Sequence, residues 1–307
     1  MLPILTPDQA FDRYEAVRER YPALPALAKE GQTAVAIANL GVLTDQFEAF
    51  VFDAFGVLNV GETPIAGACE RIEQLRAAGK RVFVLTNAAS YCFGQVVSKF
   101  ERLGFRFRQE ELISSRAVCE SHMDAFDPTL LWGVAAPSSF ETSELALSCR
   151  AMLDDARAYD EVDAFLLLSS ESWTLERQAL LLDSLLRKRR PVVVANPDIV
   201  APRETDMSVE PGFYAHDLMD KVAGLRVTFH GKPFASVYDE VEKRLGASVA
   251  PHSIAMMGDS LHTDIWGARV RGWGAVLVTE HGFLRGQDPL EAIRKSGIYP
   301  DFMTPSI

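Results

Sequence analysis

The sequence predicts an α/β protein: a doubly wound parallel sheet into which a second, smaller α/β unit is inserted. Short apolar strands alternate with amphipathic helices before and after a middle region at residues 129–226, and such alternation pairs strands in parallel with helices on both faces. Polar or acidic residues also directly follow several of these strands, which is where sites form in open α/β sheets. The 307 residues are enough for two such units.

Residues 1–47 are expected to form a helical extension ahead of the first unit. Phe11, Tyr14, Val17 and Tyr21 recur in it at helical spacing, so one face of the helix is apolar. We expect this face to pack against the body of the protein, with a contact between subunits as the alternative.

The core unit is expected at residues 48–128 and 227–307, and the inserted unit at residues 129–226. In the core unit, apolar patterning predicts strands at 49–52, 81–85, 254–257 and 275–278, and helices at 65–78, 92–103, 115–125, 234–245 and 263–271. In the inserted unit it predicts strands at 130–134, 164–168 and 191–195 and a helix at 175–189.

Composition narrows the functional classes. The net charge of −11 argues against bulk electrostatic binding to nucleic acid or to an anionic membrane. A basic cluster at 187–190 falls at the end of a predicted helix, where positive charge is favourable. No secretory signal and no apolar run long enough to span a bilayer is evident, and the four cysteines match no zinc or redox spacing. We therefore expect a cytoplasmic protein without nucleic-acid or membrane partners.

Asp53 is the first candidate for chemistry, because it ends the predicted strand at 49–52. A carboxylate in this position can act as a covalent nucleophile, although it can also simply form a turn. Gly56, three residues later, favours a sharp turn there.

Thr86, Asn87 and Lys232 are candidates for holding an anion. Thr86 and Asn87 end the strand at 81–85, where a hydroxyl and an amide can hold an anionic oxygen or cap the next helix. Lys232 lies between Gly231 and Pro233, and its compact charge suits a phosphate or a nucleophilic carboxylate.

Asp259 and Asp264 follow the predicted strand at 254–257 and precede a helix. Two acids at this spacing can hold Mg²⁺ directly and support it from behind. The alternative is that one caps the helix and the other interacts with its dipole.

The order and placement of these four segments resemble the haloacid dehalogenase superfamily of phosphotransferases and hydrolases, over residues 48–285. The resemblance implies a Rossmann-like core. The inserted unit lies between the second and third segments, where the class-two subfamily, typified by sugar-phosphate and nitrophenyl-phosphate phosphatases, carries a large α/β cap domain. The stretch 195–198 is similar to the segment that returns from that cap.

The resemblance also implies roles for individual residues. Mg²⁺ would be held by Asp53, the backbone carbonyl of Phe55 and Asp259, with Asp264 completing the acidic motif. Asp53 would be the nucleophile and form an aspartyl-phosphate. Thr86, Asn87 and Lys232 would bind the phosphate. The expected substrate is a small phosphorylated metabolite of the sugar-phosphate type, and a homodimer is a further expectation.

Phe55 departs from the family pattern, which has an acid at this position to protonate the leaving group. Three interpretations remain open: Glu171 or His230 supplies the proton, the leaving group needs none, or the protein binds a phosphorylated ligand without turnover. A carbon–halogen hydrolase is a fourth, although such relatives typically lack the acidic pair.

Substrate selection is expected in the inserted unit, in the loop at 169–173. Glu171 and Trp173 are the candidate contacts. Trp173 could stack on a ring of the substrate or anchor the following helix in a hydrophobic core.

Overall fold

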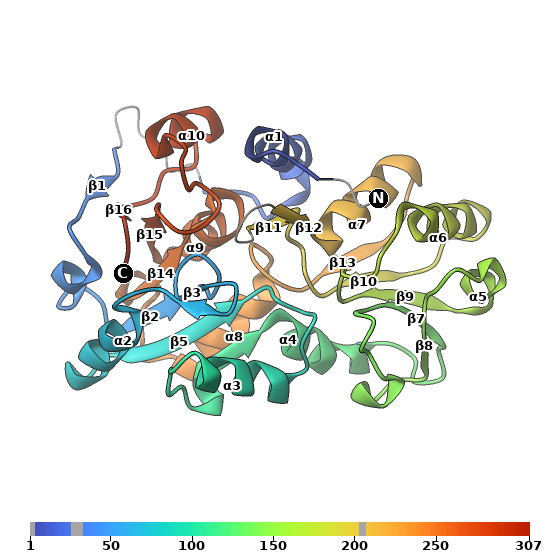
Figure 1. Ribbon diagram of the computed structural model, residues 1–307, viewed down its shortest axis with the longest axis horizontal. Helices are drawn as coiled ribbons and strands as arrows, with labels where there is room; N and C mark the ends of the chain where they lie inside the picture. Colours follow the sequence, from blue (N-terminus) through green and yellow to red (C-terminus); the bar gives the residue numbers. More distant parts are fainter. Residues whose placement is uncertain (1–3, 26–32, 203–206) are drawn as a thin grey trace.

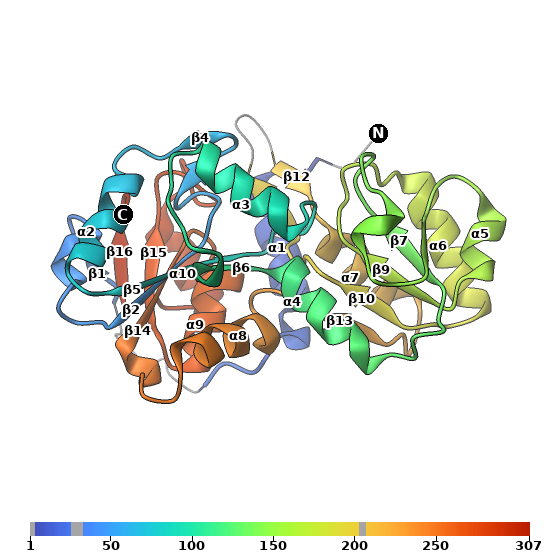
Figure 2. The same cartoon turned by 90° about the horizontal axis from the view of Figure 1, so that it is seen from below.

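The computed structural model describes residues 4–25, 33–202 and 207–307. Two parallel sheets form two lobes that lie side by side (Figures 1 and 2). The predicted α/β class is confirmed. Within the described ranges, no helix is long and apolar enough to cross a membrane.

The first lobe is built on a seven-stranded sheet in which every neighbouring pair is parallel. In spatial order its strands are β1 (Val35–Ala36), β16 (Phe302–Thr304), β15 (Gly274–Val278), β14 (Ile254–Gly258), β2 (Ala49–Phe52), β5 (Arg81–Thr86) and β6 (Leu112–Ser114). Strand β2 lies inside the sheet and all its residues are buried, which explains its uninterrupted apolar sequence.

Helices cover both faces of this sheet, because alternate side chains of each strand point to opposite sides. Phe50 and Phe52 belong to a core shared with the first pair of helices, whereas Val51 belongs to the core on the other face. The helices of the first face are α2 (Ala68–Ala77) and α3 (Phe93–Arg102). Those of the second face are α8 (Ala235–Leu245), α9 (Trp266–Arg271) and α10 (Pro289–Ser296).

The second lobe is built on a five-stranded parallel sheet. In spatial order its strands are β13 (Val227–Phe229), β10 (Val192–Val194), β9 (Ala164–Leu167), β7 (Trp132–Ala135) and β8 (Cys149–Ala151). One face packs against helices α5 (Ala156–Glu161), α6 (Leu175–Arg187) and α7 (Pro211–Lys221). Helix α4 (Ser115–His122), which leads out of the first lobe, packs Cys119 against the other face.

The boundary expected after residue 226 falls just before β13, which pairs with β10 and therefore belongs to the second sheet. The chain leaves the second lobe after Phe229. Two short hairpins complete the structure: β3 (Asn59–Val60) with β4 (Thr63–Pro64), and β11 (Val200–Pro202) with β12 (Met207–Val209).

The predicted strands are present with ends within two residues of those expected, but two helices start late. The helix predicted at 65–78 begins at Ala68, because Gly67 before it adopts a left-handed conformation. The helix predicted at 263–271 is preceded by a π-helical turn at Leu261–Ile265.

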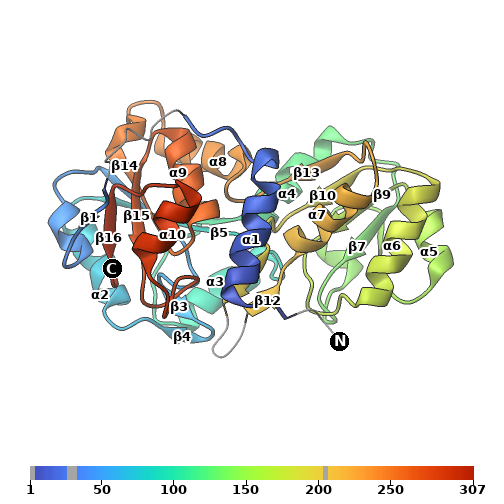
Figure 3. The ribbon, with the colours of Figure 1, turned by 90° about the horizontal axis from the view of Figure 1, so that it is seen from above.

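The N-terminal extension contains helix α1 (Pro7–Val17), which begins with a capping box between Thr6 and Gln9. Figure 3 shows α1 lying between the two lobes. The extension is not wholly helical, since strand β1 pairs with β16 at the edge of the first sheet. Its residues 1–3 and 26–32 lie outside the described ranges.

Candidate active site

The candidate site lies where the order of the first sheet reverses. From the neighbouring strands β2 and β14, the chain builds outward in opposite directions. Asp53 follows β2, Asp259 follows β14, and Thr86 ends β5, so all three lie at the carboxyl edge. Lys232 reaches the same place from the loop between β13 and α8. Such a reversal point is the usual location of a ligand site in an open α/β sheet.

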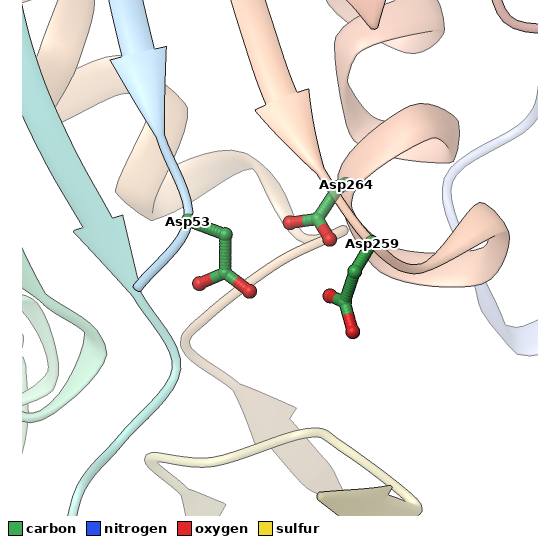
Figure 4. A group of neighbouring side chains, drawn as sticks. All are labelled: Asp53, Asp259 and Asp264. Carbon is green, nitrogen blue, oxygen red and sulfur yellow. The ribbon is translucent and has the colours of Figure 1, made fainter. Parts of the chain in front are cut away.

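Asp53, Asp259 and Asp264 form a compact acidic cluster. One oxygen from each lies within 4.8 Å of the others, and Figure 4 shows the carboxylates gathered around a common space. All three side chains are largely buried. Carboxylate oxygens are the ligands that Mg²⁺ prefers, so this donor set fits the ion implied by the sequence.

Close approach to Asp259 requires glycine in two neighbouring loops. A Cβ added at Gly282 would lie 1.9 Å from Asp259 Oδ2, and one at Gly56 would lie 2.7 Å from it. Gly56 also has a φ of +77°, which disfavours any other residue. The space gained lets the Phe283 N–H donate to Asp259 Oδ2 at 2.6 Å.

Lys232 joins two of the carboxylates. Its Nζ lies 2.6 Å from Asp53 Oδ1 and 2.7 Å from Asp264 Oδ1, and the whole side chain is buried. Burial by itself would lower the pKa of Lys232, but the adjacent Asp264 and Asp53 raise it above its ordinary value. The lysine is therefore positively charged at neutral pH.

Burial also raises the pKa values of two of the carboxylates. It raises the pKa of Asp53 to about 6, with Lys232 opposing the shift and Asp264 adding to it. The pKa of Asp259 lies well above its ordinary value because of burial and the charges of Asp264 and Asp53. One lysine faces three carboxylates, so a divalent cation bound among them would favour the ionised forms.

Thr86 and Asn87 were both predicted to bind phosphate, but only Thr86 has a hydrogen-bond donor left for it. Thr86 Oγ1 accepts from the Ala88 N–H at 3.2 Å and lines the cavity described below, so its hydroxyl hydrogen can serve an anion. Asn87 Nδ2 donates to Asp198 Oδ1 at 2.8 Å and to the Lys232 carbonyl at 3.0 Å, while its Oδ1 accepts from the Lys232 N–H at 2.7 Å. Both amide hydrogens are occupied, so Asn87 positions the Lys232 loop instead of offering donors to phosphate.

Two cavities open next to the acidic cluster. The large cavity, about 840 Å³, lies between the lobes and is lined by Asp53, Phe55 and Thr86 together with second-lobe residues such as Glu171. The small cavity, about 40 Å³, is lined by Tyr14, Asp53, Phe55, Asp198, Lys232 and Asp259, among others. The cluster thus forms part of the wall of a space large enough for a small metabolite.

Glu171 lies where the sequence predicted it. It lines the large cavity, and its two carboxylate oxygens accept from the Ser138 N–H at 2.7 Å and from Ser138 Oγ at 3.1 Å.

Trp173 does not contact the cavity in the described structure, and its predicted stacking role is corrected. The side chain is 2% exposed, packs in the hydrophobic core of the second lobe and donates from Nε1 to Gln178 Oε1 at 3.0 Å. It anchors the loop before α6, which was the alternative interpretation.

His230 likewise lines neither cavity within the described ranges. Its Nδ1 lies 3.0 Å from Ser236 Oγ, and its ring lies 4.8 Å from the ring of His122. Burial, followed by the charge of His122, lowers the pKa of His230 to about 4. A largely neutral imidazole away from the cavity is not placed to protonate a leaving group there.

Asp198 and Tyr14 reach the site although neither is a predicted site residue. Asp198 lines both cavities, and Tyr14 Oη accepts from the Ile199 N–H at 3.0 Å. Asp198 follows the second-lobe strand β10 closely, so the rule that selected Asp53 applies to it as well. Nothing local in the sequence indicates that Tyr14, far away in the chain, packs there.

Comparisons with known proteins agree with this architecture. A family model described as haloacid dehalogenase-like hydrolase matches residues 50–140, and a related HAD-hydrolase-like model matches residues 229–306. The chain is 28% identical to glycerol-3-phosphate phosphatase of Gallus gallus over 300 residues, covering 91% of this chain and 93% of the relative.

Solved structures show the same likeness. A possible sugar phosphatase of the HAD superfamily from Cytophaga hutchinsonii superposes with a TM-score of 0.74 and 26% identity, covering 89% of this chain and 98% of the other. Glycerol phosphate phosphatase from Mycobacterium tuberculosis, solved in complex with magnesium, gives a TM-score of 0.64 at 22% identity, with coverages of 85% and 75%.

Proposed function

The chain belongs to the haloacid dehalogenase superfamily of hydrolases, and from that premise we propose that it is a Mg²⁺-dependent phosphatase of small, sugar-type phosphorylated metabolites. The observation that carries the proposal is the buried cluster of three carboxylates and Lys232 in the wall of the large cavity. A metal ion held by Asp53, Asp259 and the Phe55 carbonyl, with Asp264 behind, would offset the charge of the phosphate.

The residues divide the reaction between them. The Asp53 carboxylate attacks phosphorus, the bond from phosphorus to the leaving oxygen breaks, and an aspartyl-phosphate forms. Lys232, fixed by Asp264, and the Thr86 hydroxyl stabilise the negative charge that spreads over the transferring group. Water then hydrolyses the aspartyl-phosphate and restores Asp53.

The lining of the large cavity supports a hydroxylated and uncharged leaving group. The second lobe contributes Ser169, Ser170, Glu171, Asn196 and Glu210, whose hydroxyl, amide and carboxylate groups can bond to hydroxyls. The acidic groups disfavour a leaving group that carries its own carboxylate. The names of the relatives, glycerol-3-phosphate phosphatase and sugar phosphatase, agree with this chemistry.

Phe55 favours one alternative function. Phe55 lines both cavities and its side chain cannot donate a proton, so a protein that binds a phosphorylated ligand without efficient turnover is the second candidate.

Hydrolysis of p-nitrophenyl phosphate by the purified protein, with Mg²⁺ and with EDTA, tests the proposal. This leaving group needs little help from a proton, so it reports on the nucleophile, the lysine and the metal site. We expect turnover that requires Mg²⁺. Turnover that persists in EDTA would contradict the metal dependence, and Mg²⁺ binding without any turnover would favour the binding protein.

A further inference from the structure

A phosphate ester of an alcohol releases its leaving oxygen efficiently only if that oxygen receives a proton. Phe55 cannot supply it, and Lys232 is held between Asp53 and Asp264. On the proposed function, we infer that Asp198, which reaches the site from the second lobe, donates this proton.

The position of Asp198 singles it out. Among the described residues, Asp53 and Asp198 are the two titratable residues that line both the small and the large cavity. The small cavity also contains Lys232 and Asp259 in its wall, and the large cavity is the space for the substrate. Asp198 therefore borders both the space beside Lys232 and Asp259 and the space proposed for the leaving group.

Two other second-lobe carboxyl groups that line the large cavity accept hydrogen bonds at both oxygens. Both oxygens of Glu171 accept hydrogen bonds from Ser138. The two oxygens of Glu210 accept from Asn196 Nδ2 at 3.1 Å and from Ser208 Oγ at 2.5 Å. Asp198 differs, because its Oδ1 accepts from Asn87 while its Oδ2 has no hydrogen-bond partner in the part of the chain that the structure describes.

Three contacts hold Asp198 in place. Its N–H donates to Asn196 Oδ1 at 3.0 Å, and the next N–H, of Ile199, donates to Tyr14 Oη. The amide of Asn87 connects Asp198 Oδ1 to both the carbonyl and the N–H of Lys232. One side chain therefore sets the distance between this carboxyl group and the lysine that contacts the nucleophile.

The surroundings keep Asp198 protonated. Burial raises its pKa to about 8, the positive charge of Lys232 and the Asn87 hydrogen bond oppose the shift, and the charges of Asp53 and Glu210 add to it. Tyr14 and Tyr21 of the N-terminal segment also face it, and their own pKa values are raised chiefly by burial and further by Asp198. The carboxyl group therefore carries a proton at neutral pH, as a general acid must.

The proton balance closes over two steps. In the first, the proton on Asp198 moves to the leaving oxygen as its bond to phosphorus breaks and Asp53 bonds to phosphorus, which yields the alcohol, the aspartyl-phosphate and an Asp198 carboxylate. In the second, water attacks phosphorus and gives a proton to Asp198 as the bond to Asp53 breaks. Inorganic phosphate leaves, and both aspartates return to their starting forms.

The test compares Asp198→Asn with the unmodified protein on sn-glycerol 3-phosphate and p-nitrophenyl phosphate, measuring release of the leaving group in a single turnover with Mg²⁺ present. We expect a loss of about 10²–10⁴-fold on the glycerol ester and less than about 10-fold on the nitrophenyl ester. Adding Phe55→Asp to the Asp198→Asn protein should restore part of the lost rate on the glycerol ester.

Glu144→Gln is the matched control, since it neutralises another carboxylate in the wall of the large cavity, whose two oxygens accept from Arg116 and from the Glu141 N–H; we expect it to change both rates by the same factor. An equal loss on both substrates in Asp198→Asn, with an unchanged melting temperature, would overturn the assignment. No nitrophenyl turnover by the unmodified protein would instead contradict the proposed function and this assignment with it.

Discussion

The two lobes are both parallel α/β units, and both turn strand ends toward the same cavity, but the residues at those ends differ. In the first lobe, Asp53 and Asp259 are buried and Lys232 bridges Asp53 to Asp264. In the second lobe, Glu171 at the corresponding edge is held by neutral N–H and hydroxyl donors.

The difference indicates that the two lobes have different roles, one in catalysis and one in substrate binding. Closely packed charges of opposite sign are expensive to bury and are retained where charge must be stabilised during a reaction. Acids held by neutral donors keep their capacity to accept hydrogen bonds from a ligand. The comparison predicts large losses of rate from changes in the first lobe and changes in substrate preference from the second.

Asp53→Asn should have the largest effect. Loss of the nucleophile should lower kcat for p-nitrophenyl phosphate by about 10⁴-fold or more, because no later step can occur without it. Circular dichroism and thermal melting would show whether the fold is kept. A folded variant that still hydrolyses p-nitrophenyl phosphate would show that Asp53 is not the nucleophile. The proposed difference between the lobes would then be wrong.

Asp264→Asn should come next. Asp264 pairs with Lys232 and accepts from the Ser260 N–H, and on the proposed function it would support the metal ion without binding it directly. We expect affinity for Mg²⁺ to fall by about 10–100-fold, as measured by isothermal titration calorimetry. Unchanged Mg²⁺ affinity in a folded variant would mean that Asp264 serves Lys232 alone.

The pH dependence of turnover should distinguish the contribution of Asp198, in the second lobe, from that of the first-lobe groups. The pKa of Asp198 is raised to about 8, so the protonated form that donates is present below that pH and is lost as the pH rises through it. Turnover of sn-glycerol 3-phosphate should fall about 10-fold between pH 7 and pH 9. Nitrophenyl turnover should not show this fall, and a matching decline on both esters would point to a group in the first lobe.

Glu171→Gln should have the smallest effect. An acceptor for a substrate hydroxyl is worth about 0.5–1.5 kcal/mol, so KM for a sugar phosphate should rise about 2- to 10-fold with kcat nearly unchanged. KM for p-nitrophenyl phosphate, which lacks such hydroxyls, is the control. A fall in kcat alone would place Glu171 with the catalytic groups instead.

The first lobe could be predicted well from sequence because its central strands are continuous apolar runs that end abruptly at a polar residue. Asp53, Thr86 and Asp259 mark such ends, and the structure brings them together. The strands without a prediction in the described chain are two or three residues long, and most lie at a sheet edge, where β13 contributes only Val227–Phe229. Runs this short carry no clear period.

The rest of the site depends on contacts between distant segments. The amphipathic pattern of α1 shows that the helix packs, but not that Tyr14 meets Ile199. Trp173 is a residue type that often contacts ligands, yet it is buried in the core of the second lobe, where its ring lies 6.4 Å from that of Tyr159 on helix α5. The raised pKa of Asp198 arises chiefly from burial between the lobes, which no local pattern reveals.

Helix α1 and the turn that follows it connect the two lobes through contacts of two different kinds. On one side, Arg13 and Arg20 pair with Asp220 of α7 in a partly exposed setting. On the other, Tyr14 stacks on the buried His262, whose Nε2 lies 2.7 Å from Glu15 Oε1. Salt screens the first contact far more than the second. The ion pairs with α7 would therefore weaken as ionic strength rises, whereas the buried contacts of Tyr14 with His262 and with the Ile199 N–H would be little affected.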